Sequence, residues 1–366
     1  MTPERARELL RASVGRRVLL IGDLMMDEWV FGSVKRISPE APIPVVNMPL
    51  TPDARAEKPG GAGNAAAILL TLGASVAVVG VIGDDDFGRR LRSDLAARGA
   101  DVSGLITDSS RPTTHKLRIL AGRQQLLRID TESDLPFDSA ISGRLLDVTR
   151  SMLPQAAVVL VSDYAKGVVS SASLPGDVIE EARAARIPFC ADPKPVNMDL
   201  FRGASLVSPN EAEALHAAAG SAGFSLPSQP PSQAEAWATL PPHIVAAGRA
   251  LRERLNADAV FITRGANGIA VFAEDQVAAV PAIARPGDVA RPAAATAVGK
   301  ADLAVGDATG CGDAVSAASS LALAAGASYL ETAELANAAG GVVSRFVGVH
   351  SPTADEIVHW LGRAGR

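Results

Sequence analysis

The 366-residue chain has little cysteine, few aromatic residues and no excess of positive charge. Its two cysteines, Cys190 and Cys311, lie far apart, which excludes a zinc spacing or disulfide framework and favours a reduced cytoplasm. A formal net charge of −5 argues against general nucleic-acid binding, which needs Lys and Arg to neutralise phosphates. No segment has the roughly 18 uninterrupted apolar residues of a membrane span, and the charged N-terminus lacks an export signal's apolar core. We therefore expect a cytoplasmic protein without nucleic-acid or membrane partners.

Hydrophobic residues make up 48% of the sequence and are mostly Ala, Val and Leu. Short β-branched runs alternate with longer helical stretches, which predicts an α/β fold with a mostly parallel sheet covered on both faces. The expected strands are Val18–Ile21, Val76–Ile82, Val158–Ser162, Phe189–Asp192, Leu206–Ser208 and Ala259–Thr263.

Polar or glycine-containing turns follow these strands. Ligands in open α/β sheets bind beyond the carboxyl ends of the strands, so we expect the turns to line one crevice. The turns are Gly22-Asp23, Gly83-Asp84-Asp85-Asp86, Ser162-Asp163-Tyr164, Asp192-Pro193-Lys194, Ser208-Pro209-Asn210 and Thr263-Arg264-Gly265.

Two segments depart from the alternation of strand and helix. Lys35–Met48 contains three prolines and is expected to be an edge strand or extended ribbon. Thr113–Asp130 alternates polar and apolar residues around Ala121-Gly122, which predicts a β-hairpin. Together they indicate a small sheet beside the main domain, either a lid or a dimerisation surface. Ser221–His243 and Pro281–Ala297 have the composition of flexible insertions.

The segment Asp307-Ala308-Thr309-Gly310-Cys311-Gly312-Asp313 leads into a helical stretch, Ala314–Ala325. Glycines on a loop entering a helix let backbone N–H groups approach an anion, and the helix dipole favours negative charge there. Asp313 would then lie beside a transferred phosphoryl group and accept a proton from the attacking hydroxyl. The alternative is a glycine-rich turn with Asp313 as an ordinary first-turn acid.

A second glycine-rich segment, Lys58–Asn64, precedes an expected helix at Ala65–Leu72. Gly60 and Gly61 would permit a sugar ring to approach, and the Asn64 amide offers both a donor and an acceptor. Asn64 could instead be an N-cap. Asp27, six residues after the first strand, could accept hydrogen bonds from sugar hydroxyls or be a solvated loop acid.

These two glycine-rich segments resemble the signatures of the ribokinase-like (PfkB) carbohydrate kinases. Gly83–Gly88, Asn210–Glu213 and Asn337 extend the resemblance from about Val18 to about Pro352. It implies a ribokinase-like three-layer α/β/α domain at about 15–355, with lid segments at about 28–48 and 110–131. It also implies ATP and Mg²⁺ as cofactors, with Asn210 and Glu213 organising Mg²⁺ and the phosphates, partly through water. Glu213 could otherwise be an ordinary surface acid. We further expect nucleotide contacts from Lys194, Thr263, Gly265 and Asn337.

Four further stretches are similar to one branch of this family: Arg36–Val45, Lys116-Leu117-Arg118, Ser162–Gly167 and Asp192-Pro193-Lys194. That branch phosphorylates D-glycero-D-manno-heptose 7-phosphate to the 1,7-bisphosphate, on the route to ADP-heptose for lipopolysaccharide. Many of its members are bifunctional, and a chain of this length is expected to contain the kinase alone. Cys311 stands where this branch usually has Ala, and the Ser221–His243 insertion is longer than is typical.

A sugar that already carries a phosphate needs cations in its pocket. Lys116 and Arg118, two apart in an alternating strand, would point to one face, joined by Arg36 or Arg128. A solvated strand face is the alternative. Asp163 and Asp192 could hold ring hydroxyls over the same crevice.

These residues predict transfer of the ATP γ-phosphoryl group to the anomeric hydroxyl, with Asp313 as the base and the amides of Gly310, Cys311 and Gly312 stabilising the moving charge. A kinase for another sugar or sugar phosphate, a nucleoside kinase and a non-catalytic sugar-binding regulator remain alternatives. No G-x-G-x-x-G turn follows the first strand, which disfavours a dinucleotide-binding dehydrogenase. We expect a homodimer formed through the lid sheet. The need for a monovalent cation stays open.

Overall fold

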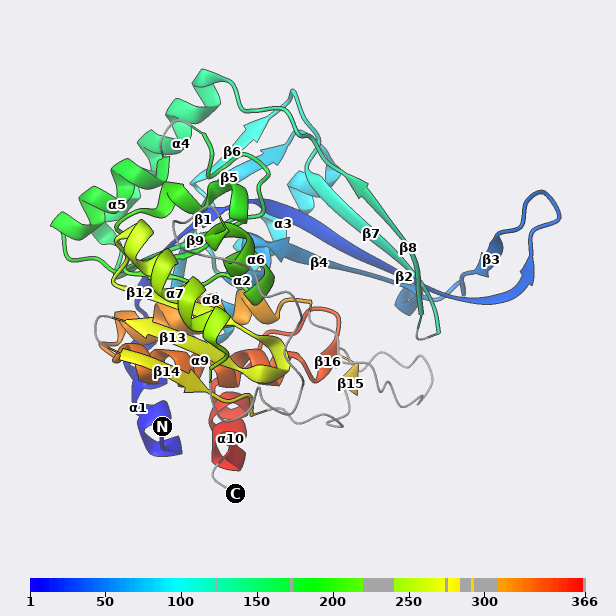
Figure 1. Cartoon of the computed structure of the whole chain (residues 1–366). Helices are drawn as coiled ribbons and strands as arrows, with labels where there is room; N and C mark the ends of the chain where they lie inside the picture. Colours follow the sequence, from blue (N-terminus) through cyan, green and yellow to red (C-terminus); the bar gives the residue numbers. More distant parts are fainter. Residues whose placement is uncertain are drawn as a thin grey trace.

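The computed structural model describes residues 1–122, 124–171, 174–219, 240–273, 276–283, 291–292 and 309–364. Its largest element is a nine-stranded sheet that is parallel except at one edge, where β12, β13 and β14 run antiparallel (Figure 1). The strand order is β14 (Gln276–Val280), β13 (Ile269–Ala273), β12 (Ala259–Thr263), β11 (Leu206–Val207), β10 (Phe189–Asp192), β9 (Val158–Ser162), β1 (Arg17–Gly22), β5 (Ser75–Gly83) and β6 (Leu105–Asp108).

All six expected strands are therefore present, with ends that differ by a residue or two. The antiparallel pair β13 and β14 was not expected. Successive side chains of a strand point to opposite faces of the sheet, so a strand buried on both faces is apolar throughout. In β1, Val18 and Leu20 pack into one core cluster while Leu19 and Ile21 pack into the other.

Helices cover both faces of this sheet. One core contains buried residues of α1 (Pro3–Ser13), α2 (Ala62–Thr71), α3 (Asp86–Ala97), α8 (Cys311–Ala324), α9 (Tyr329–Val343) and α10 (Ala354–Ala364). The other core contains residues of α4 (Ser139–Met152), α5 (Leu174–Ala184), α6 (Glu211–Ala218) and α7 (Pro242–Leu255). Short 3-10 helices span Pro52–Ala54, Leu153–Gln155, Pro195–Phe201 and Gly265–Asn267. The expected three-layer α/β/α arrangement is confirmed.

A five-stranded second sheet, called the lid sheet or lid below, stands off the body (Figure 1). Its long strand β2 (Leu24–Ile37) pairs with β7 (Thr114–Ala121) on one side, and with β4 (Arg55–Gly61) and β3 (Pro44–Asn47) on the other. β7 pairs in turn with β8 (Gln124–Thr131), so the expected hairpin is confirmed. β4 was not expected, because its Lys58-Pro59-Gly60-Gly61 segment has strong turn formers.

The two expected insertions lie mostly outside the described residues, which omit 220–239, 284–290 and 293–308. Pro242 and His243 nevertheless belong to α7, so the helix begins before the predicted end of the first insertion. Arg291–Pro292 forms the short strand β15, which pairs with β16 (Phe346–Val347). None of the helices in the described part of the chain is long and apolar enough to cross a membrane.

Candidate active site

The site begins where the order of the parallel strands reverses. β1 lies between β5, which follows it in sequence, and β9, which begins the other half of the sheet. Such a switch point opens a crevice at the carboxyl ends of the two strands. Asp23 directly follows β1, and the segment 163–168 directly follows β9, so the two meet at this crevice.

Asp23 fixes the backbone of the segment 163–168. Its buried carboxylate accepts hydrogen bonds from the N–H groups of Tyr164, Lys166 and Val168 at 2.8, 3.0 and 3.1 Å. Burial raises the pKa of Asp23 to about 6, although these hydrogen bonds act to lower it. A carboxylate that accepts three backbone hydrogen bonds has a structural role. By fixing the backbone of this segment, Asp23 orients the side chains of Tyr164 and Lys166.

Asp163 also serves this segment, which corrects its expected role in binding ring hydroxyls. Its carboxylate accepts hydrogen bonds from the N–H groups of Ala165 and Lys194, both at 2.8 Å, and from Asn197 Nδ2 at 3.0 Å. Only 1% of the side chain is exposed. The lone pairs of the carboxylate are thus used within the protein, and Asp163 joins the loops after β9 and β10.

Asp313 lies in the first turn of α8, with its carboxylate between Asn64 of α2 and Tyr164 of the segment 163–168. It is 4% exposed, and both of its carboxylate oxygens accept a hydrogen bond: Oδ2 from Asn64 Nδ2 at 2.6 Å and Oδ1 from the Tyr164 hydroxyl at 2.8 Å. Burial raises the pKa of Asp313 to about 6; these two hydrogen bonds oppose the shift, and the charge of Asp27 adds to it. Asp313 is therefore ionised at neutral pH but remains able to accept a proton.

The glycine that precedes this helix has a definite steric role. Gly310 is the N-cap of α8 in the left-handed region, with φ of +79°. A Cβ atom there would lie 2.8 Å from Asn64 Nδ2, the group that binds Asp313. Cys311, partly buried, and Gly312 form the first helical residues, and the first N–H groups of a helix have no partner within it. Asp307 and Ala308 lie outside the described residues.

Asn64 belongs to the interior of α2 and is not its N-cap, which is Gly61. Gly61 has φ of +56°, and a Cβ atom at Gly60 would overlap the carboxylate of Asp27. Asn64 Oδ1 is buried and accepts no hydrogen bond from the described part of the chain. Because a buried polar atom is normally paired, this oxygen fits a ligand hydroxyl.

Asp27 is on β2 of the lid sheet and is 5% exposed, so it is not a solvated loop acid. One oxygen accepts a hydrogen bond from Arg118 Nη1 at 2.6 Å. The charge of Asp27 raises the pKa of Asp313, which places the two carboxylates in one electrostatic environment. The structure thus brings Asp27, Gly60, Gly61, Asn64 and Asp313 together, as expected from the sequence.

Asp192 is the last residue of β10 and contacts α8. It accepts a hydrogen bond from the Ser316 hydroxyl at 3.2 Å, and a Cβ atom at Gly312 would lie 3.6 Å from its Oδ2. Burial raises the pKa of Asp192 to about 7, with further contributions from the charges of Asp313 and Glu213. Several carboxylates therefore share this end of the crevice.

Lys194, Asn210 and Glu213, which were predicted to bind the nucleotide, are joined by hydrogen bonds. Lys194 Nζ donates a hydrogen bond to Glu213 Oε1 at 2.6 Å and lies 5.4 Å from the centre of the Tyr164 ring. Asn210 and Glu213 form a capping box at the start of α6, with reciprocal side-chain to backbone bonds of 2.9 Å. The Glu213 carboxylate is thus held by the capping box and by Lys194, and its part in binding Mg²⁺ and phosphates remains a prediction.

The other residues predicted to contact the nucleotide are Thr263, Gly265 and Asn337. Thr263 ends β12 and pairs with Asn210 through an isolated parallel bridge, so it borders the same region. Gly265 has φ of +53° and begins the following 3-10 helix. The side chain of Asn337, on α9, donates a hydrogen bond to the Pro281 carbonyl at 2.8 Å. Contact of these three residues with a nucleotide remains a prediction.

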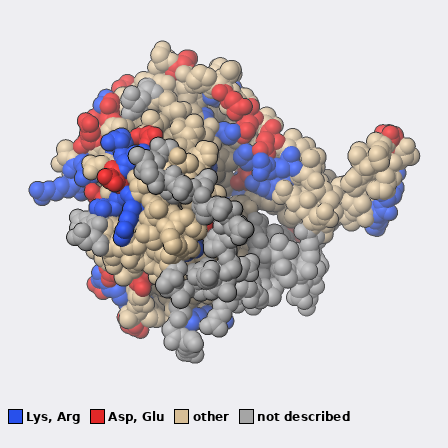
Figure 2. Space-filling view, viewed as in Figure 1, with Lys and Arg blue, Asp and Glu red and all other residues tan. Residues whose placement is uncertain are grey.

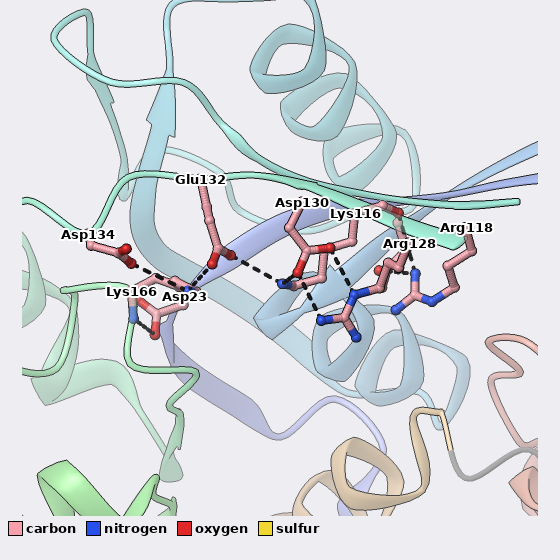
Figure 3. A network of polar contacts seen from close by, with 9 residues as sticks. Asp23, Lys116, Arg118, Arg128, Asp130, Glu132, Asp134 and Lys166 are labelled. Carbon is pink, nitrogen blue, oxygen red and sulfur yellow. Dashed lines mark hydrogen bonds and ion pairs between the residues drawn. The ribbon is translucent and has the colours of Figure 1, made fainter. Parts of the chain in front are cut away.

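The lid sheet carries the expected cations, which lie among acidic side chains near its base (Figures 2 and 3). Lys116 Nζ lies 3.0 Å from Asp130 and 3.2 Å from Glu132, and Arg118 binds Asp27. Arg128 also pairs with Asp130, at 2.8 Å, whereas Arg36 lies on the exposed far part of β2. Lys116 and Arg118 are only 15% and 13% exposed, so they do not form a solvated strand face.

The donors at this site fit Mg²⁺ only as an ion shared with a nucleotide. Among the described residues, no three His, Cys, Asp or Glu side chains converge as a ready-made metal cage. The raised pKa of Asp192, due to burial and to the charges of Asp313 and Glu213, indicates repulsion that a cation would relieve. Mg²⁺ commonly retains waters and takes its other ligands from phosphates. Glu213 and Asn210 fit this limited role.

Sequence reasoning did not identify Tyr164 or Lys166 as site residues, or Asp23 as their anchor. Asp23 and Tyr164 lie in turns expected to line the crevice, and Tyr164 and Lys166 lie in the stretch Ser162–Gly167 that resembles one branch of the family, but neither signal gave any of the three a role of its own. The contact of Tyr164 with Asp313 joins residues 149 apart in the chain, and no local pattern encodes it.

The fold and this site define the class of the protein. A buried carboxylate at the start of a glycine-led helix faces a lid across the switch point of an α/β sheet, as a carbohydrate kinase requires. The family model for pfkB family carbohydrate kinases matches residues 30–295, so the chain belongs to that family.

Relatives and solved structures agree with this assignment. The chain is 37% identical to the bifunctional protein HldE of Paramagnetospirillum magneticum and 38% identical to that of Caulobacter vibrioides, each over 95% of this chain. It spans 64% of the length of each, so it matches only part of those proteins.

A structure of a putative ribokinase from Agrobacterium tumefaciens has a TM-score of 0.68 at 19% identity, covering 95% of this chain and 97% of the other. Arabidopsis thaliana ribokinase, solved with ribose and ATP, has a TM-score of 0.64 at 18% identity, covering 95% and 99%. The fold is ribokinase-like.

Proposed function

We propose that the protein phosphorylates the anomeric C1 hydroxyl of D-glycero-D-manno-heptose 7-phosphate with ATP, giving the 1,7-bisphosphate for ADP-heptose and lipopolysaccharide core synthesis. The observation that carries this proposal is Asp313, a buried carboxylate held by two hydrogen bonds at the start of α8. The similarity to the HldE proteins supports the choice of sugar.

Asp313 acts as the general base. As the anomeric oxygen bonds to the γ-phosphorus, the bond from that phosphorus to the β,γ-bridging oxygen breaks and ADP leaves with the electron pair. The hydroxyl proton passes to Asp313. A pKa of about 6 suits this step, because the group is ionised at pH 7 yet more basic than an exposed Asp. The transition state is largely dissociative, so positioning matters more than base strength.

The other residues position the reactants. Asn64 Oδ1 and Asp27 accept hydrogen bonds from sugar hydroxyls, and the N–H groups at the start of α8 bind the transferred phosphoryl group. Lys194 and the Asn210–Glu213 pair bind the triphosphate, together with Thr263, Gly265 and Asn337. Mg²⁺, when held by Glu213 and Asn210 partly through water, neutralises phosphate charge.

The cations of the lid support a phosphorylated sugar over a neutral one. Lys116, Arg118 and Arg128 are on β7 and β8, on the lid face that also carries Asp27. A neutral sugar would leave these groups paired only with Asp and Glu side chains. Closing the lid over the substrate would exclude water and suppress ATP hydrolysis.

We also propose a cytoplasmic homodimer formed through the lid. Its sheet exposes large apolar side chains: Ile37 and Ile43 are 60% and 56% exposed, and Leu127 and Ile129 are 53% and 45% exposed. Exposed apolar groups on a sheet that extends away from the body are typical of an interface. Sedimentation of the purified protein, with an Ile37→Lys variant as comparison, tests this arrangement.

ADP release by the purified protein tests the proposed reaction. Three acceptors are compared at equal concentration: heptose 7-phosphate, unphosphorylated heptose and fructose 6-phosphate. We expect the highest kcat/KM for heptose 7-phosphate. A preference for fructose 6-phosphate would assign the protein another sugar phosphate, and sugar binding without ADP release would make it a regulator.

A further inference from the structure

Five charged side chains alternate in sign along the base of the lid (Figure 3). The order is Arg128, Asp130, Lys116, Glu132 and Lys166. Glu132 contacts both lysines: its Oε1 lies 2.7 Å from Lys166 Nζ and its Oε2 lies 3.2 Å from Lys116 Nζ. One carboxylate thus bridges two ammonium groups with its two oxygens.

The two lysines come from different parts of the molecule. Lys116 is on β7 of the lid, whereas Lys166 is on the segment of the body that Asp23 anchors, two residues after Tyr164. The side chains of Lys116, Lys166 and Glu132 are 15%, 20% and 23% exposed, so the cluster is accessible but largely desolvated. Although burial acts to raise it, hydrogen bonds from Lys166 and Lys116 hold the pKa of Glu132 below its ordinary value.

The register of the lid sheet shows where the cluster lies relative to Asp27. In the register of the lid sheet, Asp27 is opposite Lys116, and Lys116 is opposite Asp130. Neighbouring strands are about 4.8 Å apart, so Lys116 is one strand farther from the crevice than Asp27. Asp27 is thus next to Lys116, and its charge also acts on Asp313.

A small recess, large enough for about one water molecule, lies beside Lys166. It is lined by Asp23, Arg111, Thr114, Ser133 and Lys166. Asp23 is committed to three backbone N–H groups, and Arg111 is committed to Asp108 and to backbone carbonyls. Three hydroxyls, those of Thr113, Thr114 and Ser133, and the ammonium of Lys166 also line it, and the Thr113 hydroxyl accepts a hydrogen bond from the Gly83 N–H.

We propose that Lys116 and Lys166 bind the distal phosphate of a sugar phosphate substrate, and that Glu132 is an internal counter-ion which this phosphate displaces. The inference rests on the proposed function and adds Lys166 and Glu132 to it. A phosphate monoester presents at least two oxygens to two ammonium groups, as the Glu132 carboxylate does, but with more charge. A neutral sugar cannot displace Glu132, so the acid favours phosphorylated substrates. Because Lys116 is on the lid and Lys166 is on the body, a phosphate bound by both lysines also links these two parts of the molecule.

Three variants test this site: Lys166→Met, Lys116→Met and Glu132→Gln, with Arg150→Met as the control. Arg150 pairs with Asp177 and Glu181 on the surface between α4 and α5, away from the lid. The KM of each variant is measured for heptose 7-phosphate, for unphosphorylated heptose and for ATP. Binding of inorganic phosphate alone is measured by calorimetry at constant ionic strength.

Both lysine variants are expected to raise the KM for heptose 7-phosphate by about tenfold or more, the loss typical of one charge-assisted hydrogen bond, and to weaken inorganic phosphate binding. The KM values for unphosphorylated heptose and ATP should stay within about twofold. Glu132→Gln should lower the KM for heptose 7-phosphate and tighten phosphate binding, a gain that damaged folding cannot produce.

Equal increases in KM for both sugars, or a higher KM for heptose 7-phosphate in Glu132→Gln, would overturn the proposal and leave the cluster as a lid contact. Failure of the wild type to phosphorylate either heptose would refute the proposed function. The calorimetric comparison of wild type and Lys166→Met would still decide whether the lysines form a phosphate site.

Discussion

The hydroxyl of Tyr164 is expected to set the pH range in which Asp313 works. It donates a 2.8 Å hydrogen bond to the ionised carboxylate and so lowers its pKa against the effect of burial. Tyr164→Phe removes this bond and retains the ring that lies 5.4 Å from Lys194. A hydrogen bond to a charged group contributes about 1.5–3 kcal/mol, which corresponds to roughly 1–2 pKa units.

The expected change follows from the protonation state that the reaction needs. A general base must be ionised, so activity falls as the pH drops below the pKa of Asp313. Raising that pKa from about 6 to roughly 7.5 would lower the ionised fraction at pH 6.5 by about eightfold, and would have little effect at pH 9. The acidic limb of kcat/KM should therefore shift upward by about 1–2 units in Tyr164→Phe.

The assay is ADP release between pH 5 and pH 9 at constant ionic strength. The second pKa of a phosphate monoester is also near 6, so the shift is taken as the difference between variant and wild type. Tyr329→Phe is the matched control, since Tyr329 is the other tyrosine of the chain and its hydroxyl donates to the Ser205 carbonyl. An acidic limb that coincides in Tyr164→Phe and wild type would refute the reasoning, as would an equal shift in the control.

Further substitutions probe the surroundings of Asp313. Gly310→Ala should lower stability in urea unfolding by about 1–3 kcal/mol and reduce kcat, because φ is +79° and the new methyl group meets Asn64; unchanged stability would contradict the steric argument. Asp192→Asn should raise the melting temperature of the ligand-free protein by more at pH 8 than at pH 5: the folded pKa of about 7 exceeds the ordinary 3.8, so stability is lost progressively as the pH rises from about 4 to about 7, by at most about 4 kcal/mol. A difference that is the same at both pH values would show that ionisation is not its cause. Lys194→Met should raise the KM for ATP by about tenfold, and an unchanged KM would separate the Lys194–Glu213 pair from the nucleotide.

The sequence predicted most of the main sheet because its signal there is local. A parallel strand buried on both faces must be apolar throughout, as in Val158–Ser162, and the polar turn after it marks the carboxyl end. The hairpin at Thr114–Thr131 was also predictable from alternation alone. Asp313 and Asn64 were predicted as site residues because each lies at the end of a glycine-rich segment, and a loop that approaches an anion or a sugar needs glycine.

Other features depended on contacts between distant residues. β4 contains Pro59, Gly60 and Gly61, which disfavour a strand, and it forms because it pairs along β2. Asp163 follows a strand just as Asp192 does, yet its carboxylate is committed to backbone N–H groups that only the folded chain brings to it. The same holds for the ion pair of Glu132 with Lys166, whose partners follow strands of different sheets.

The most direct test of the account is the turnover of Asp313→Asn with heptose 7-phosphate and saturating ATP. Asn is close in size to Asp and can retain a contact with Asn64, so ATP and sugar binding measured by calorimetry should change little. We expect kcat to fall by at least about 10²-fold. A variant that binds both substrates normally and turns over at a near-normal rate would contradict the role of Asp313 as the base, and with it the proposed mechanism.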